Sequence, residues 1–437
     1  MGVADRLREM REGFAPAFWV ANVTELFERL SYYAVFASLA NYLHESLAFP
    51  AAQASSLTGI FGGAVWFLAV FGGALADRLG FRRALSLAYL ILSSAYFLLG
   101  SIGAPWLAPV RAAVPLAGLV GFILLLPALG TALVKPSVVG TTARASSENV
   151  RSLGYSIYYT LVNIGGAAGP SLASVVHKHL RVESVFRLAA LSVLLMFFAV
   201  LLFFREPRRV DVGHAPSLAS VLGNLRTVLA NPKFLLFLLI FSGYWMVFWQ
   251  QFIVLPLYLH GYVNPKADVE LILATDPATV IVLQVAASLL MRKIPAFRTI
   301  TLGTLISSAA WLILAWRPAV WTAVASLVVV ALGEITQSPR YYEYISRLAP
   351  PEQQGTYMGF AFLPIGIGSL AGGWLGGRLI HHFGEVAHRP ERMWWVISGI
   401  GTLTALMLWL YDRVVRRPME SSSAATKRSR PEERRMF

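Results

Sequence analysis

The feature that most constrains this chain is a series of apolar stretches, each about as long as a membrane is thick. A transmembrane helix needs about 20 mostly apolar residues. Twelve stretches meet this requirement, and arginine and proline clusters separate them. They lie at 17–43, 53–76, 82–103, 112–140, 150–177, 185–204, 233–260, 268–291, 298–316, 318–346, 354–381 and 393–415. The sequence therefore predicts an all-α polytopic membrane protein with twelve transmembrane helices.

The composition excludes several other classes of protein. The chain has 437 residues, of which 56% are hydrophobic and 14% are charged, whereas soluble proteins carry about 25% charged residues. It has no cysteine, which excludes disulfides, thiolate catalysis and cysteine-ligated metals. The net charge is +14, but the arginines stand at the ends of apolar stretches rather than among aromatic residues on one face. No nucleic-acid partner is therefore expected.

The arginine and lysine residues also predict how the chain is oriented. An even number of spans puts both termini on one side, and cytoplasmic loops are enriched in these residues. With both termini in the cytoplasm, the inner loops and tails hold about three times as many of them as the outer loops. We therefore expect a multi-pass protein of the inner (plasma) membrane with cytoplasmic termini. The outer-loop histidines are interpreted as surface residues rather than metal ligands, because no carboxylate cluster completes a site; they are His177, His179, His381, His382 and His388.

The longest polar interruption divides the twelve stretches into two sets of six. We expect an N-terminal six-helix bundle at 1–204, a cytoplasmic linker at 205–232, a C-terminal six-helix bundle at 233–416 and a disordered tail at 417–437. Two six-helix halves with a linker resemble the layout of the major facilitator superfamily, which implies a substrate site between the halves near the middle of the membrane.

A short basic loop follows the second stretch and carries a recognisable pattern. The segment Gly73-Ala-Leu-Ala-Asp77-Arg78-Leu-Gly80-Phe-Arg82 resembles motif A of the major facilitator superfamily. Asp77 can cap a helix N-terminus, and the arginines favour the cytoplasmic side. We interpret Asp77, Arg78 and Arg82 as part of a cytoplasmic gate. A generic basic loop is the alternative.

Ionisable residues inside the first stretch point to function, because charges in hydrocarbon are costly. Glu25, Glu28 and Arg29 share one helical face, and Glu25 and Arg29 stand in the favourable i,i+4 order. Two carboxylates against one guanidinium leave a negative charge unless a proton or another cation joins them. Lys135 in stretch 112–140 is a candidate for that cation. A permanently neutral ion-pair cluster is the alternative.

Four ordered motifs narrow the resemblance further. They are Glu25-x-x-Glu28-Arg29-x-Ser31-Tyr32-Tyr33, Gly130-Thr-Ala-Leu-Val-Lys135-Pro136, Tyr155-Ser-Ile-Tyr158-Tyr159-Thr-Leu-Val-Asn163 and Gly333-Glu334-x-x-x-Ser338-Pro339. Together they resemble the signatures of the proton-dependent oligopeptide transporter family over most of the chain. The resemblance implies proton coupling at Glu25, Glu28, Arg29 and Lys135. The substrate-binding candidates are Tyr32, Tyr33, Phe36, Lys135, Tyr155, Asn163, Trp245, Trp249, Asp276, Glu334 and Ser338.

Departures from that family affect the expected substrate. Phe36 stands where the family usually has an arginine that holds the peptide carboxylate, and Trp249 stands where it has a glutamate. Asp276 precedes Pro277 where the family has asparagine and proline. We hypothesise that Asp276 replaces the missing glutamate as the carboxylate that faces a substrate amine. Alternatively, its helix starts later and Asp276 is only the N-cap before the proline.

The stretch at 318–346 ends in a charged group with Arg340 and Glu343 at i,i+3. We interpret Arg340 and Glu343 as an inner-gate salt-bridge cluster or a solvated helix end, with a substrate anion site at Arg340 as a lesser alternative.

These patterns predict a secondary transporter rather than an enzyme. The favoured reading is proton-coupled symport of small peptides or peptide-like amino compounds by alternating access, driven by a proton gradient without a cofactor. The alternative is a transporter of the same fold for a different organic solute or anion, or a drug exporter. A membrane enzyme or a transporter-like receptor is a third reading, but no nucleophile triad, metal cluster or phosphate loop supports it. The chain is expected to be monomeric.

Overall fold

The computed structural model describes residues 13–207, 223, 226, 230–291, 294–348 and 354–416, and within them the chain is helical without β-strands. All twelve predicted stretches are helical, nine of them as one continuous helix and three as broken helices. Eight of the helical spans are long and apolar enough to cross a membrane by length and composition alone. The predicted tail and most of the predicted linker lie outside the described residues.

The first half is built from six long helices and short connecting turns. They are α2 (Pro16–Asn41), α3 (Ala51–Leu79), α4 (Phe81–Leu99), α6 (Leu116–Arg144), α7 (Arg151–His179) and α8 (Glu183–Phe203), with the turns η1 (Tyr42–Ser46) and η2 (Pro105–Leu107) and the short helix α5 (Ala108–Ala113). Each long helix begins or ends within a few residues of its predicted stretch.

The second half contains the three broken helices. The first consists of α10 (Pro232–Phe248), α11 (Gln250–Ile253), α12 (Leu255–Tyr258) and η3 (Leu259–Val263), the second of α13 (Val269–Leu273) and α14 (Thr275–Met291), and the third of α17 (Gln354–Phe360), α18 (Leu363–Leu379) and η5 (Ile380–Val386). The continuous ones are α15 (Ala296–Trp316), α16 (Val320–Leu348) and α19 (Arg392–Tyr411), which η6 (Asp412–Arg416) follows.

Prolines contribute to these breaks. Pro256 lies in the first turn of α12, and Pro364 lies in the first turn of α18. Proline has no N–H to donate to the preceding turn, and its ring clashes with the carbonyl of that turn. Broken membrane helices leave backbone groups and side chains available near the middle of the bilayer, where transporters bind their substrates.

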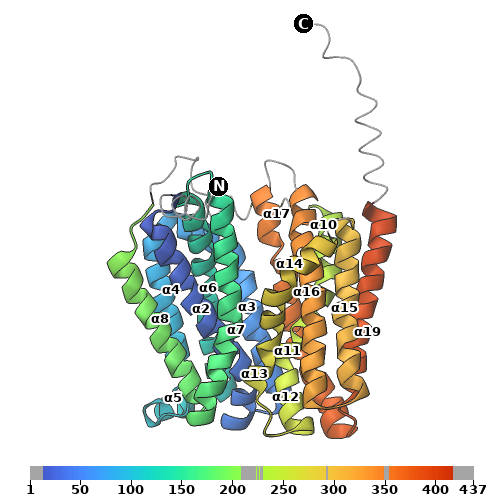
Figure 1. The fold of residues 1–437 in the computed structure, drawn as a ribbon. Helices are drawn as coiled ribbons and strands as arrows, with labels where there is room; N and C mark the ends of the chain where they lie inside the picture. The colour runs from blue at the N-terminus through green and yellow to red at the C-terminus, as the bar shows by residue number, and fades with distance from the viewer. Residues whose placement is uncertain are drawn as a thin grey trace, which may run out of the picture.

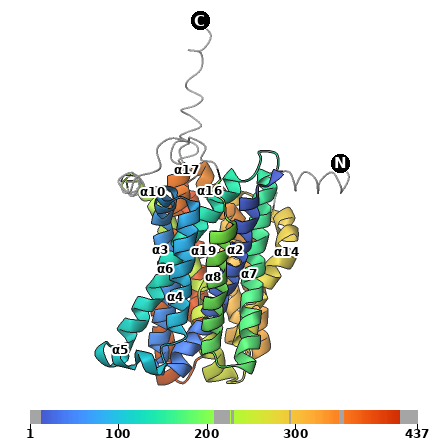
Figure 2. The ribbon, with the colours of Figure 1, turned by 90° about the vertical axis from the view of Figure 1, so that its left-hand side faces the viewer.

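The two halves stand side by side, the first in blue to green and the second in yellow to red (Figures 1 and 2). We call the end where α2 begins the proximal end and the end where α2 finishes the distal end. Helices α3 and α18 join the halves closely through glycine. A Cβ atom on Gly59 would lie 2.7 Å from the Cα of Gly373, so this approach requires glycine, as at many membrane helix interfaces.

Candidate functional site

A buried ion pair lies on α2 in the first half. The guanidinium of Arg29 donates two hydrogen bonds to the carboxylate of Glu28, one of them 2.6 Å long from Nη2 to Oε1. The hydroxyl of Thr131, on α6, lies 3.4 Å from the same Oε1 atom. Both members of the pair are at most 2% exposed. This two-pronged contact neutralises two charges that would otherwise be very costly at this depth.

Glu25 completes the cluster without a hydrogen bond. Its Oε1 atom lies 3.5 Å from Nε of Arg29, and neither of its oxygens has a hydrogen-bond partner among the described residues. The spacing of the sequence predicts the i,i+4 pair of Glu25 with Arg29, but the shorter contact is the one with Glu28. Glu25 is therefore the carboxylate that can take up a proton without breaking a hydrogen bond.

Lys135 lies on α6 beside this cluster. Its ammonium group is 3.9 Å from the centre of the Trp66 ring, a cation–π contact. Among the described ion pairs, Glu25 and Glu28 are both joined to Arg29 rather than to Lys135. Lys135 is close enough to Glu25 for an electrostatic interaction, but the two do not form a salt bridge among the described residues. Lys135 therefore has no carboxylate partner among the described residues.

An aromatic group joins the two halves on the distal side of the ion pair. Phe36 is fully buried and stacks on Phe252 with ring centroids 4.8 Å apart, and its centroid lies 5.3 Å from that of Trp249. The Trp249 indole N–H donates to the backbone oxygen of Ile365. Tyr32 stacks on Phe61 of α3 and has no hydrogen-bond partner for its hydroxyl in the described part of the chain. The two positions where charge was expected from the family resemblance are therefore in contact with each other.

The second half contributes two carboxylates. Asp276 is 4% exposed, and its Oδ2 atom accepts a hydrogen bond of 3.2 Å from the Gln251 side chain. Its Oδ1 atom has no partner among the described residues. Glu334, on α16, has Asp276 as its electrostatic neighbour. Asp276 is buried and Glu334 is partly buried, and neither forms a salt bridge with a cation among the described residues. Two such acids within electrostatic reach of each other favour a proton or a positively charged group between them.

Asp276 is not the cap of its broken helix. Asp268 has that role, because its carboxylate accepts a hydrogen bond from the backbone N–H of Leu271 at the start of α13. Asp276 lies within the apolar span Val269–Ala287. The helix α14 begins at Thr275, so Asp276 lies in its first turn and is not its N-cap residue; its role toward a substrate stays a prediction.

The remaining substrate-binding candidates lie on α7, α10 and α16. Helix α7 packs against α2, where a Cβ on Gly165 would lie 2.8 Å from the Arg29 side chain. On α7, Tyr155 is exposed, and the Asn163 amide donates to the backbone oxygen of Tyr159 within the same helix. Trp245 on α10 is buried, and Ser338 on α16 accepts a hydrogen bond of 2.7 Å from Gln337. These residues come from both halves, but among the described residues no hydrogen bond or salt bridge joins Tyr155 or Asn163 to the ion pair on α2.

The sequence profile described as the Major Facilitator Superfamily matches this chain over residues 23–264 and 263–435. The two matches cover nearly the whole chain. The chain belongs to the Major Facilitator Superfamily. It is therefore a multi-pass membrane transporter of the major facilitator fold, with twelve transmembrane helices and no enzymatic activity or cofactor.

Curated relatives of this Major Facilitator protein include drug transporters by name. It is 22% identical over 346 residues to the "Multidrug resistance protein MdtH" of Klebsiella pneumoniae, which covers 78% of this chain and 81% of the relative. It is 23% identical over 360 residues to the protein of the same name from Salmonella newport, which covers 81% of this chain and 84% of the relative.

Solved structures with the same fold include peptide transporters. One is a POT family transporter in complex with 5-aminolevulinic acid, with a TM-score of 0.73, 16% identity, and coverage of 90% of this chain and 95% of that one. Another is a POT family transporter in complex with a thioalcohol-conjugated peptide, with a TM-score of 0.74, 18% identity, and coverage of 91% and 96%. Identities this low show a shared fold.

The loop between α3 and α4 of this Major Facilitator protein forms a basic groove of about 720 Å³ with the end of α8. The guanidinium of Arg82 donates to the backbone oxygen of Leu201, and Arg78 lines the groove. The N-terminus of α4 is capped by Glu206, whose carboxylate accepts two backbone N–H groups at 2.8 Å each. The sequence suggested Asp77 for a capping role, but its side chain lies outside the described residues. Glu206 was not anticipated because it is more than a hundred residues away.

The charged group on α16 is a network within one helix. Arg340 donates to Glu343 at 2.6 Å and to the backbone oxygen of Met291 at 2.9 Å, and Arg347 also contacts Glu343 at 2.6 Å. These residues lie at the proximal end of the second half. The salt bridges lie within α16, and the hydrogen bond from Arg340 to Met291 ties α16 to α14. Among the described residues none of these contacts joins one half to the other, and the gate role stays a prediction.

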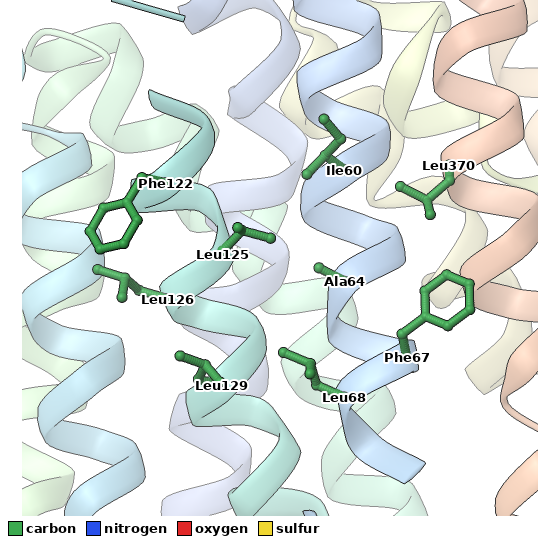
Figure 3. Close-up of a pocket in the computed structure, with 9 residues that line it drawn as sticks. All are labelled: Ile60, Ala64, Phe67, Leu68, Phe122, Leu125, Leu126, Leu129 and Leu370. Carbon is green, nitrogen blue, oxygen red and sulfur yellow. The ribbon is translucent and has the colours of Figure 1, made fainter. Parts of the chain in front are cut away.

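A separate apolar groove of about 510 Å³ opens between α3, α6 and α18 (Figure 3). Its lining is entirely apolar and consists of Ile60, Ala64, Phe67, Leu68, Phe122, Leu125, Leu126, Leu129 and Leu370. Phe122 is 63% exposed, as suits a side chain that faces lipid. The groove lacks any group for a charged solute, so the charged residues between the halves remain the candidate transport site.

Proposed function

We propose that this Major Facilitator protein couples a proton gradient to the transport of small peptides or peptide-like amino compounds. The observation that carries the proposal is a set of under-neutralised carboxylates on α2, α14 and α16, inside the two bundles. Glu25 has no hydrogen bond beside the Arg29–Glu28 pair, and Asp276 has a single amide partner beside Glu334. Buried carboxylates of this kind exchange protons or bind cations as their surroundings change.

In this mechanism, a proton on Glu25 cancels the excess negative charge of the α2 cluster. The amino group of the substrate neutralises Asp276 and Glu334, and a substrate carboxylate approaches Lys135. Binding of proton and substrate together removes the cost of enclosing these charges, so the two halves can rock about the site. We further propose that both termini are cytoplasmic, that the segment 205–232 joins the bundles at 1–204 and 233–416, and that the protein acts as a monomer.

A second candidate is the export of drug-like organic cations. It is favoured by the names of the curated relatives and by the aromatic group of Phe36, Trp249 and Phe252. Aromatic faces with nearby carboxylates bind apolar cations well. In that case protons and solute would move in opposite directions through the same acidic residues.

The deciding experiment is transport by purified protein in proteoliposomes under an imposed proton gradient. Radiolabelled dialanine should accumulate with the proton flux, and Glu25→Gln should abolish this accumulation. Movement of ethidium against the proton flux, without dialanine uptake, would instead select the exporter. Absence of both activities in folded protein would refute proton coupling to either class of solute.

A further inference from the structure

The distal end of the molecule holds charged side chains that the proposed transport site does not use. Polar contacts between described residues of the two halves gather there. Lys178 at the end of α7 contacts Asp268 before α13 at 2.5 Å, and Ser174 donates to the same carboxylate at 2.7 Å. The short helix α13 of the second half lies beside α7 and α2 (Figure 1). His260 of η3 lies 3.1 Å from Asn41 at the distal end of α2.

Two histidine–carboxylate pairs lie among these contacts, and each pair crosses between the halves. Nδ1 of His260 (η3) lies 2.6 Å from the Glu45 carboxylate (η1). Nδ1 of His177 (α7) lies 2.8 Å from the Glu270 carboxylate (α13). His177 is predicted to be a surface residue rather than a metal ligand; its side chain is 35% exposed, and it also contacts a carboxylate of the other half.

The surroundings of His260 require a proton on both ring nitrogens. Nε2 lies 2.9 Å from the backbone oxygen of Ala267, which can only accept, and Nδ1 faces the Glu45 carboxylate. An imidazole that donates from both nitrogens is an imidazolium. The Asn41 side chain also lies 3.1 Å from Nδ1, and its amide oxygen has no other partner among the described residues, so the amide can turn that oxygen toward the ring.

In the second pair, the buried Glu270 carboxylate likewise favours a protonated histidine. It is 5% exposed, and its Oε1 atom accepts from Ser38 at 3.2 Å while facing His177. Both partners belong to the first half, whereas Glu270 belongs to the second. A buried carboxylate needs a positive partner, and a protonated His177 supplies one only while the halves are together.

We propose that His260, His177, Glu45 and Glu270 form a proton-binding site that locks the two halves together at the distal end. Closing brings each histidine to a carboxylate and so favours its proton, and by linkage a proton favours closing. The remaining charged groups that face the site are His44 of η1 and the Lys178–Asp268 pair. The inference rests on the proposed alternating access but not on the identity of the substrate.

The sign of the pH dependence follows from the two groups that lie beyond the apolar spans. Burial disfavours the imidazolium of His260, but its hydrogen bonds to Glu45 and Ala267 outweigh this effect and raise its pKa above 6.5. The hydrogen bond from His260 lowers the pKa of Glu45 below 4.5. The ion pair of His260 with Glu45 is therefore fully formed between pH 4.5 and pH 6.5, the ordinary pKa values of the two groups. It weakens as pH rises through the raised pKa of His260, and again as pH falls through the lowered pKa of Glu45.

The test uses the absence of cysteine from the chain. Spin labels at Ser46→Cys and Lys266→Cys, both exposed and on opposite halves, report the distal distance by double electron–electron resonance in nanodiscs without substrate. Lowering the pH from about 8.5 to about 5.5, which straddles histidine titration, should increase the short-distance population several-fold. His260→Gln combined with His177→Gln should remove this response.

A matched control and a milder variant complete the design. His381 pairs with Glu385 on its own segment at 2.7 Å, so His381→Gln should leave the response intact. Glu45→Gln, at an exposed position, should weaken the response without risk to folding. The proposal is overturned if the native distance ignores pH, if the double histidine variant keeps the response, or if His381→Gln also removes it. A pH-dependent distance in protein that transports neither dialanine nor ethidium would leave the lock standing and refute only the proposed function.

Discussion

Replacing each carboxylate of the α2 cluster by its amide should separate stability from coupling. Glu28 is fully buried and accepts two hydrogen bonds from Arg29. Removing one partner of such a pair leaves a buried charge and costs about 3–5 kcal/mol. Because Glu25 lies 3.5 Å from the same guanidinium and compensates in part, we expect Glu28→Gln to lower the free energy of unfolding by about 3 kcal/mol. Glu25→Gln breaks no hydrogen bond and should change it by less than about 1 kcal/mol.

The transport phenotypes should differ from the stability ranking. Glu25→Gln should abolish uptake driven by a proton gradient, because the amide cannot exchange the proton that cancels the charge of the cluster. It should leave counterflow intact, since exchange of labelled for unlabelled substrate needs no net proton movement. Thermal unfolding of the purified variants measures the first effect. Parallel gradient-driven and counterflow assays in proteoliposomes measure the second.

Two results would refute this reasoning. If Glu25→Gln destabilises the protein as much as Glu28→Gln, the two carboxylates share Arg29 equally and the contacts described here do not govern the cluster. If Glu25→Gln retains gradient-driven uptake, the proton is carried elsewhere, whatever its effect on stability.

Three further experiments probe other parts of the molecule. Asp276→Asn should raise the KM for an amine substrate by about tenfold, because one charge-assisted hydrogen bond is lost. An unchanged KM in uptake assays would show that Asp276 does not bind the amine. Phe36→Arg and Trp249→Glu should each lower the free energy of unfolding by about 3 kcal/mol, because each buries an unpaired charge. The double variant should recover part of this loss, and additive losses in thermal unfolding would contradict the contact between the two positions. Glu206→Gln should lower the free energy of unfolding by about 1 kcal/mol, because the carboxylate caps α4. Arg83→Gln in the same groove should leave it unchanged, and equal unfolding temperatures of the two variants would argue against the cap.

The apolar pattern of the sequence predicts the helices well, because lipid requires long apolar runs and satisfied backbone groups. The stretch predicted at 298–316 is α15, Ala296–Trp316. The breaks in the second half are harder to predict. Pro256 marks one of them, but the backbone also departs from regular helix at Trp249, whose indole N–H is held by the backbone of Ile365. That interaction depends on a helix more than a hundred residues away.

The sequence predicts that Glu25, Glu28 and Arg29 lie close together, as they do, but not how they pair. Spacing rules favour the i,i+4 pair of Glu25 with Arg29, yet the guanidinium turns toward Glu28, which also lies near Thr131 on another helix. Lys135 was expected near the carboxylates, but Trp66 of α3 provides a face for its ammonium group. Side-chain choices of this kind depend on neighbours that only the packed bundle brings together.

The departures from the family at Phe36 and Trp249 are linked, because the two residues are in contact. In the proton-dependent oligopeptide transporters that the chain resembles, an arginine and a glutamate stand at these positions, and here the two rings lie 5.3 Å apart. Losing one charge alone would leave the other buried and unpaired at a cost of several kcal/mol, so the two positions are expected to change together. Gln251, two residues beyond Trp249, donates to Asp276. The structure therefore puts a different carboxylate beside the break in the α10–α12 helix. A substrate amine would still find an acid in the second half, whereas a substrate carboxylate would have only Lys135 in place of the missing arginine.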